Sequence, residues 1–313
     1  MDTILTSELS VLLSDQYRLR DFTLLRILQT RGERQTLLLG TPAGKLVVKL
    51  THSCRDENTV AAETGILAHL ARYAFPSPLP LSTCDGRLYV PFGDRFVTIY
   101  KYLEGTHPLP DDAFFTELGR LLARLHSLPT AGFERPSAYR PAAILGVARD
   151  FLSGVSNSIH RSAVGELLQI IAHFPSFEDL PLGFIHTDPC YDNLLITSDG
   201  SLLLIDWDDS GITYPLLDVA YVVAFLCTFL PWDRELLKVP GEGRVTWRPD
   251  WAHRFLQAYH DTRPLNASEK ACFRAAIHLN FLVYIRDWET NSFIYDNYLR
   301  MKMVESFTDP VLE

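Results

Sequence analysis

Residues Phe184–Ile196 read FIHTDPCYDNLLI, and a short distance later residues Leu204–Asp208 read LIDWD. The first segment contains the pattern His-x-Asp-x-x-x-x-Asn. The second places Asp206 after another apolar run, beyond a turn at Asp199-Gly200. The short apolar runs that flank the polar residues are expected to form buried strands. Such strands hold polar side chains rigidly, which is a requirement for catalytic groups.

The residue types in these two segments suit phosphoryl transfer, in which an enzyme positions an acceptor hydroxyl and fixes Mg²⁺ on the phosphates. Asp188 is the candidate base that accepts the proton of the hydroxyl. Asn193 and Asp206 offer the hard oxygen ligands that Mg²⁺ prefers, so they are the candidate metal ligands. Asp208 is a candidate substrate contact, with a metal contact or a plain loop carboxylate as alternatives. Neither segment is specific alone, but together they strongly indicate a kinase-type site.

Two further residues of the loop are interpreted as structural. His186 is expected to organise the loop, because the base in the kinase template is an Asp. Cys190 has no evident paired base and is interpreted as a bystander thiol. The chain has an odd number of cysteines and no C-x-x-C pair, which indicates reduced thiols in a cytosolic protein rather than a disulfide scaffold or a zinc site.

The rest of the chain divides near residue 103 into a strand-rich part and a helix-rich part. A short amphipathic helix is predicted over residues 7–20. Strands are predicted at 22–28, 36–39, 45–50, 88–91 and 95–102, with a helix at 60–73 and a polar turn over 29–35 that contains Gly32. Helices are predicted from residue 110 onward, including 141–153, 162–174, 216–230, 249–261, 267–287 and 292–306. The predicted domains are therefore 1–102 and 103–313.

The sequence resembles the aminoglycoside phosphotransferase and choline kinase family, which shares the protein kinase fold. His186, Asp188 and Asn193 match its catalytic loop, and Asp206 matches the position of the Asp in the Asp-Phe-Gly motif of protein kinases. Weaker matches lie at residues 102–105, 118–126 and 215–220, and the resemblance extends from about residue 20 to 300. It implies an α+β, two-lobed fold. A small antiparallel sheet with one main helix would bind nucleotide, and a larger, mainly helical lobe would hold the catalytic loop and the substrate site.

The resemblance also implies ATP and Mg²⁺ as cofactors and assigns further residues to the nucleotide. Lys49 is expected to contact the α- and β-phosphates and to pair with Glu63 on the following helix. A lysine at the end of a buried strand is costly unless it is paired, which agrees with this assignment. The turn at Gly32 would cover the phosphates, and the backbone around Lys101 and Leu103 would hold the adenine.

Two positions near the catalytic loop are notable in the light of the resemblance. Thr187 stands where many relatives have Gly, which puts no required chemical group in doubt. Asp218 is expected to hold the catalytic loop in place rather than to take part in the chemistry.

Composition limits the classes of partner. The formal net charge is −9 and no Lys/Arg-rich run occurs, which argues against nucleic acid. The acidity mildly favours a cationic substrate, although solubility alone is the better explanation of it. The N-terminus lacks the basic start of a secretory signal. The longest apolar run, Val219–Trp232, is too short to span a bilayer and is expected to form a buried helix. These features predict a cytoplasmic protein with a small-molecule substrate and no membrane or nucleic-acid partner.

Aromatic residues are frequent in the C-terminal helices, at Tyr284, Trp288, Phe293 and Tyr295. Aromatic residues at helical spacing usually belong to a core. Asp287 and Glu289 beside them keep open a cation-binding cage for a substrate ammonium group, with Asp287 as the candidate substrate contact.

The leading hypothesis is an ATP-dependent kinase that phosphorylates a hydroxyl of a small, amine-bearing acceptor. The acceptor classes are an amino alcohol, an amino acid such as homoserine, or an aminoglycoside-like compound, and the motifs look closer to homoserine-kinase-like members. One alternative is an inactive nucleotide-binding protein of the same fold, which should have lost Lys49 or the loop residues. A metal-dependent hydrolase is a third hypothesis, and it gives Lys49 no role. The acceptor, the preference for ATP over GTP, and the oligomeric state are left open.

Overall fold

The computed structural model describes residues 5–31, 33–130, 132–133, 140–156, 158–283 and 293–313. The chain forms two compact units: Met1–Gly105 with Thr197–Asp199, and Thr106–Ile196 with Gly200–Glu313. The assignment of residues 1–102 to nucleotide binding and of residues 103–313 to catalysis and substrate stays a prediction.

The first unit is built on a five-stranded antiparallel sheet in the order β1-β2-β3-β5-β4. As predicted, three strands come first, then a helix, then two more strands. The elements of this unit are α1 (Ser7–Tyr17), β1 (Thr23–Arg31), β2 (Arg34–Thr41), β3 (Gly44–Leu50), α2 (Glu57–Arg72), β4 (Val90–Phe92) and β5 (Arg95–Lys101).

The polar turn predicted over residues 29–35 is wrong, because most of these residues belong to the first hairpin. Gln29 pairs with Thr36, Thr30 with Gln35, and Arg31 with Arg34. Backbone hydrogen bonds continue a ladder whatever the side chains are, so polar residues at the exposed end of a hairpin do not end it. Gly32 lies outside the described residues, and its role in covering the phosphates stays a prediction.

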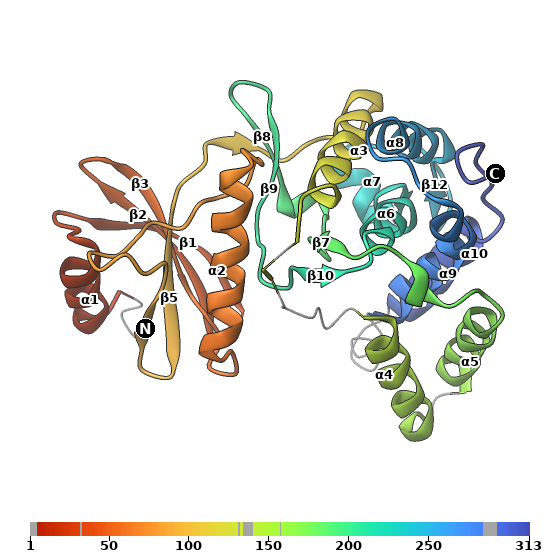
Figure 1. The fold of residues 1–313 in the computed structure, drawn as a ribbon, viewed down its shortest axis with the longest axis horizontal. Helices are drawn as coiled ribbons and strands as arrows, with labels where there is room; N and C mark the ends of the chain where they lie inside the picture. The colour runs from red at the N-terminus through yellow and green to blue at the C-terminus, as the bar shows by residue number, and fades with distance from the viewer. Residues whose placement is uncertain (1–4, 32, 131, 134–139, 157, 284–292) are drawn as a thin grey trace. The chain divides into compact units, whose positions relative to one another are not determined.

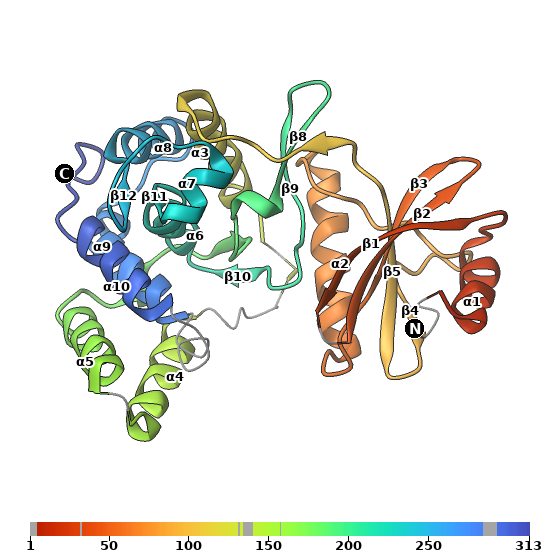
Figure 2. The same cartoon turned by 180° about the vertical axis from the view of Figure 1, so that it is seen from behind.

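Alternation along the strands gives the sheet two different faces. One face is apolar and packs on Leu9 and Leu13 of α1; its residues are Leu37, Leu39, Leu46, Val48, Leu50, Val97 and Ile99. Because side chains alternate along a strand, Lys49 lies on the other face, between Val48 and Leu50 in sequence. Figures 1 and 2 show α1 and α2 on opposite sides of this sheet. Lys49 therefore points to the side of the sheet that carries α2.

Helix α2 begins directly after a capping residue, Asp56. The carboxylate of Asp56 accepts a hydrogen bond from the backbone N–H of Thr59 at 2.7 Å, which satisfies one of the free amides of the first turn. The helix buries an apolar stripe that includes Val60, Ile66 and Leu70.

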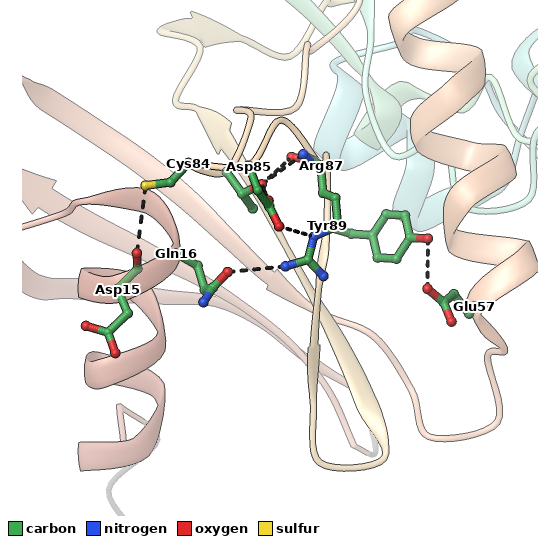
Figure 3. A network of polar contacts seen from close by, with 8 residues as sticks. Asp15, Gln16, Glu57, Cys84, Asp85, Arg87 and Tyr89 are labelled. Carbon is green, nitrogen blue, oxygen red and sulfur yellow. Dashed lines mark hydrogen bonds and ion pairs between the residues drawn. The ribbon is translucent and has the colours of Figure 1, made fainter.

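A polar network connects α1 to α2 through the loop that precedes β4 (Figure 3). The backbone N–H of Cys84 donates to the carbonyl of Gln16 at 2.8 Å, and Arg87 donates to the Gln16 side chain at 3.3 Å. The Tyr89 hydroxyl donates to Glu57 of α2 at 3.1 Å. These bonds fix the end of α1 and the start of α2 to one loop, which holds the two helices in place around the sheet.

The second unit is mainly helical. Its helices are α3 (Asp112–His126), α4 (Pro141–Gly154), α5 (Ser158–Ala172), α6 (Leu216–Tyr221), α7 (Pro231–Leu237), α8 (Pro249–Thr262), α9 (Ala267–Val283) and α10 (Phe293–Val304). Its short strands are β7 (Gly183–Ile185), β8 (Leu194–Thr197), β9 (Leu202–Leu204), β10 (Gly211–Thr213), β11 (Thr228–Phe229) and β12 (Thr246–Trp247). β7 pairs with β10, β11 pairs with β12, and β8 lies between β9 and β6 (Gly105–Thr106). No helix in the described ranges is long and apolar enough to cross a bilayer.

The helix predicted over residues 216–230 is shorter than expected. α6 ends at Tyr221 and continues as one wide, π-helical turn over Val222–Leu226, closed by a hydrogen bond from Cys227 N–H to the Val222 carbonyl at 3.2 Å. The hydroxyl of Thr228 donates to the Ala224 carbonyl at 2.6 Å, and the chain then enters β11. The prediction that the apolar segment Val219–Trp232 is buried is confirmed for residues 219–230, of which only Phe225 is half-buried, whereas Trp232 is 44% exposed. Wide turns of this kind occur often at functional sites.

Helices α3 and α8 lie side by side (Figures 1 and 2), and Gly119 allows their close approach. A Cβ atom at this position would lie 2.5 Å from the carbonyl oxygen of Phe255. We expect Gly119→Ala to reduce the free energy of unfolding by about 1–3 kcal/mol, because backbone atoms cannot move aside cheaply. Urea denaturation measures this change.

Gly146 provides the matched control, because it lies inside α4 and an added Cβ meets nothing within 4 Å. Gly146→Ala should leave stability unchanged or raise it by about 0.5–1 kcal/mol, since alanine favours the helix. Equal effects of the two substitutions would contradict the role given to Gly119.

Candidate active site

The hairpin of β8 and β9 brings the two predicted metal ligands to one end of the same short ladder. Leu194 pairs with Leu204, and the backbone N–H of Ile205 donates to the carbonyl of Asn193 at 2.9 Å. Asn193 precedes β8 and Asp206 follows β9, so the antiparallel register places them next to each other. The strands and turn predicted from residues 194–205 therefore form the local support of the site.

His186 connects the catalytic loop to the segment that carries Asp206. Its Nε2 atom lies 2.9 Å from the carbonyl oxygen of Ile205, and its ring contacts the Trp207 indole edge-on, with the centroids 4.8 Å apart. The side chain is buried. These contacts are structural, which agrees with the interpretation of His186 as an organiser of the loop.

Asp218 holds the backbone of the catalytic loop, as predicted. Its carboxylate accepts hydrogen bonds from the backbone N–H groups of His186 at 2.7 Å and Thr187 at 2.9 Å. Thr187 has a φ of 77°, a left-handed conformation that is strained for a β-branched residue. This explains why a glycine is suited to the position, and Asp218 stabilises the conformation by binding the amide.

A buried chain of hydrogen bonds supports Asp218 from behind. The carboxylate can only accept, so His126 donates from Nε2 to Asp218 over 3.3 Å, and its Nδ1 accepts from the hydroxyl of Tyr259 at 2.8 Å. Arg263 in turn donates to the Tyr259 oxygen at 3.0 Å and forms an ion pair with Glu269 at 2.9 Å. Burial lowers the pKa of His126, while the bond to Asp218 opposes the shift. The chain thus links the catalytic loop to α3, α8 and α9.

Asp188 is half-buried, and both of its carboxylate oxygens accept hydrogen bonds. The Tyr221 hydroxyl donates to Oδ1 at 2.7 Å, and the Asn193 amide donates to Oδ2 at 3.1 Å and to the Asp188 carbonyl at 2.9 Å. The carboxylate is therefore fixed in orientation, as expected of a base that receives a proton from a positioned hydroxyl. Its catalytic role stays a prediction.

The sequence interpretation missed Tyr221, although a signal was present. Asp218 and Tyr221 stand three residues apart on α6, so they share one face of that helix. Asp218 binds the backbone of the catalytic loop, and Tyr221 binds its carboxylate. Tyr221, one helical turn after Asp218, was thus a candidate for contact with Asp188.

The donors around Asn193 and Asp206 fit a hard divalent cation. The Asn193 amide nitrogen is used by Asp188, and its amide oxygen has no donor among the described residues, which leaves this oxygen for a cation. Asp206 is half-buried with a φ of 61°, a strained conformation that positions the carboxylate beyond β9. No cluster of three or more His, Cys, Asp or Glu that could hold a metal occurs in the described part of the chain. Kinase Mg²⁺ sites use few protein ligands and complete their coordination with phosphate and water.

The other loop residues lack a direct part in this arrangement. Burial raises the pKa of the Cys190 thiol to about 12, with Asp188 adding to the shift, so the thiol is protonated at neutral pH and unsuited to be a nucleophile. Asp208 is buried, with 5% of its surface exposed, and its assignment to substrate stays a prediction. Asp287 lies outside the described residues, as do Tyr284, Trp288 and Glu289.

In the first unit, Lys49 on β3 and Glu63 on α2 are nearly buried, with 8% and 4% of their surfaces exposed. Glu63 also lies 3.5 Å from the guanidinium of Arg55, which provides a positive partner for its charge. The pairing of Lys49 with Glu63 stays a prediction. Lys101 ends β5 and is exposed, and Leu103 follows half-buried, so their role in holding adenine also stays a prediction.

Removal of the Tyr221 hydroxyl tests the geometry around Asp188. We expect Tyr221→Phe to lower kcat about tenfold and to leave the KM for nucleotide unchanged, because a hydrogen bond to a charged group is worth about 1.5–3 kcal/mol. Steady-state kinetics at saturating acceptor measures the change. Tyr298→Phe is the control, since that hydroxyl lies 3.4 Å from Glu166 and does not contact Asp188. An unchanged kcat in Tyr221→Phe would remove Tyr221 from the site.

Known proteins similar to this chain include phosphotransferases and small-molecule kinases. Residues 25–271 match the model of the phosphotransferase enzyme family. Among curated proteins, the homoserine kinase of Gluconobacter oxydans is 28% identical over 271 residues, a match that covers 82% of this chain and 80% of that protein.

Solved structures of the same fold are also similar over nearly the whole chain. A complex of amicoumacin kinase with AMP-PNP and Ca²⁺ superposes with a TM-score of 0.68 at 15% identity, covering 96% of this chain and 92% of the other. A microcompartment-associated aminopropanol kinase gives a TM-score of 0.60 at 19% identity, covering 95% and 93%. These likenesses confirm the predicted two-lobed, kinase-like α+β fold.

The family match covers most of the chain and includes the catalytic loop, Asn193, Asp206 and Asp218. It confirms the resemblance read from the two short segments of sequence. The chain belongs to the phosphotransferase enzyme family, and it is a small-molecule kinase whose phosphate acceptor is a hydroxyl group.

Proposed function

We propose that this enzyme transfers the γ-phosphoryl group of ATP to the hydroxyl of a small, amine-bearing acceptor of the homoserine or amino-alcohol type. The observation that supports it best is the fixed carboxylate of Asp188, held at both oxygens next to the hairpin that presents Asn193 and Asp206. Asp188 would accept the proton of the acceptor hydroxyl as the oxygen attacks the phosphorus.

Other residues would bind the metal ion and the nucleotide and hold the loop in position. Asn193 and Asp206 would hold Mg²⁺, which when bound supplies positive charge that neutralises the phosphate oxygens. Lys49, supported by Glu63, would contact the phosphates of the nucleotide. Asp218 keeps the loop backbone in its strained form, so that Asp188 and Asn193 stay in position for each turnover.

The acceptor class rests on two lines of support. The curated relatives are homoserine kinases, and a neighbour of the same fold is an aminopropanol kinase. In addition, Asp188, Asp206 and Asp208 lie within a short span of sequence, and such a concentration of carboxylates favours a substrate that carries an ammonium group.

An acceptor screen tests this function. Purified enzyme is incubated with Mg²⁺, ATP and a panel that contains homoserine, 3-aminopropan-1-ol, choline, an aminoglycoside and glycerol, and ADP release is measured by a coupled assay. We expect turnover with amine-bearing acceptors and little turnover with glycerol. ADP release that is the same with and without any acceptor would favour a hydrolase, and no release under any condition would favour an inactive nucleotide-binding protein.

A further inference from the structure

Arg300 on α10 is a cation whose hydrogen-bond donors are only partly satisfied among the described residues. Its side chain is 12% exposed, and its Nη2 atom forms an ion pair with Asp233. Its Nε atom is buried and has no hydrogen-bond partner among the described residues. Guanidinium carries five N–H donors, so one carboxylate leaves several of them for another acceptor.

A short series of contacts connects Arg300 to the base. The guanidinium lies 5.9 Å from the centroid of the Phe225 ring, in the wide turn that follows α6. The Phe225 ring lies 5.1 Å from that of Tyr221, whose hydroxyl binds Asp188. Burial lowers the pKa of Arg300, and Asp233, Tyr221 and Asp296 oppose the shift, so the Tyr221 hydroxyl lies within electrostatic reach of the guanidinium.

A buried N–H donor without an acceptor is unfavourable, so the Nε atom of Arg300 requires an explanation. Asp296, the other nearby carboxylate, is already bound by Arg244 at 2.6 Å. Among ligands, a carboxylate matches the planar fork of arginine best, because it accepts two N–H groups at once. An ammonium group would be repelled at the same place.

We propose that Arg300 binds the carboxylate of an amino-acid acceptor whose hydroxyl lies at Asp188, which selects hydroxy amino acids over amino alcohols that lack the carboxylate. This inference rests on the proposed function and narrows its acceptor class. The series of contacts from Arg300 to Asp188 includes only two side chains, Phe225 and Tyr221, so the acceptor proposed is a short molecule that carries hydroxyl, ammonium and carboxylate groups.

Homoserine and 3-aminopropan-1-ol form a matched pair of probes, because the second is the first without its carboxylate. We measure kcat and KM for both with the unaltered enzyme, Arg300→Met and Arg300→Lys. We expect Arg300→Met to lower kcat/KM for homoserine about 100-fold, mainly through KM, and to change the value for 3-aminopropan-1-ol less than about threefold. Arg300→Lys should recover part of the loss, since it keeps the charge but not the fork.

Lys302→Met is the control on the same helix, because Lys302 pairs with Glu166 and Glu305 instead of contacting Phe225. It should leave the ratio of kcat/KM values for the two acceptors unchanged. Activity towards 3-aminopropan-1-ol in Arg300→Met shows that the variant is folded. If that activity is lost, the ratio of kcat/KM for homoserine to kcat/KM for 3-aminopropan-1-ol in Arg300→Lys tests the inference instead.

Three results would overturn the inference. One is an equal loss for both acceptors in the Arg300 variants, which indicates a role in folding only. Another is a preference for homoserine over 3-aminopropan-1-ol that is the same in Arg300→Met as in the unaltered enzyme. The last is an unaltered enzyme that phosphorylates 3-aminopropan-1-ol as well as homoserine or better, which leaves the kinase function standing and removes the carboxylate site. If the unaltered enzyme uses neither acceptor, the inference fails, and the acceptor screen decides whether the proposed function fails as well.

Discussion

Asp188→Asn is expected to lower kcat by about 10³-fold, because general-base catalysis contributes about 10²–10⁴-fold and Asn cannot accept the proton. Nucleotide affinity should change less than about threefold, since Asn is isosteric and keeps an oxygen that accepts from Tyr221 or Asn193. Kinetics with the acceptor found in the screen measures kcat, and equilibrium titration with Mg²⁺ and ATP measures binding.

Asp192→Asn removes a neighbouring carboxylate of the same loop and serves as the control. Asp192 is exposed, whereas Asp188 is half-buried and bonded at both oxygens. The control should keep kcat within about twofold, as surface substitutions usually have small effects. Unchanged turnover in Asp188→Asn would show that another group accepts the proton.

Asp206→Ala is expected to weaken Mg²⁺-dependent ATP binding by about two orders of magnitude. A carboxylate ligand to Mg²⁺ supplies charge stabilisation of several kcal/mol, and no other described carboxylate ends β9 beside Asn193. Calorimetric titration with ATP, in the presence of Mg²⁺ and then of EDTA, separates the metal-dependent part of the binding from the rest.

Asp209→Ala provides the control, because Asp209 is exposed and lies three residues further along the chain. It should retain the Mg²⁺ dependence of the unaltered enzyme. Tight binding of Mg²⁺ and ATP by Asp206→Ala would contradict the assignment of Asp206 as a ligand. The small release of backbone strain expected from the substitution would appear only as a change in stability.

The proximity of the proposed site residues could be predicted because its signal is local. His186, Asp188 and Asn193 lie within one short segment, and Asp206 follows after a single hairpin. A hairpin of two short strands brings such residues together, whatever the fold of the rest of the chain. Hydrophobic periodicity is also a local signal, which explains why most helices and strands of the first unit agree with the predicted ones.

The errors occur where the side chains gave no signal for the backbone. Residues 29–35 are polar, yet most of them continue a ladder whose hydrogen bonds are independent of side chains. The apolar run after Leu216 predicts a helix, but the wide turn at Val222–Leu226 and the bond from Thr228 to the Ala224 carbonyl end it early.

The sequence by itself determined the reaction class, because the proposed base and the proposed metal ligands stand at a spacing that one local hairpin converts into a site. Only the tertiary structure decided which side chains support that site. The contacts of Asp188 with Tyr221, of Asp218 with His126, and of Arg300 with Phe225 join residues from different helices. Their proximity depends on how those helices pack, which spacing along a single chain does not contain.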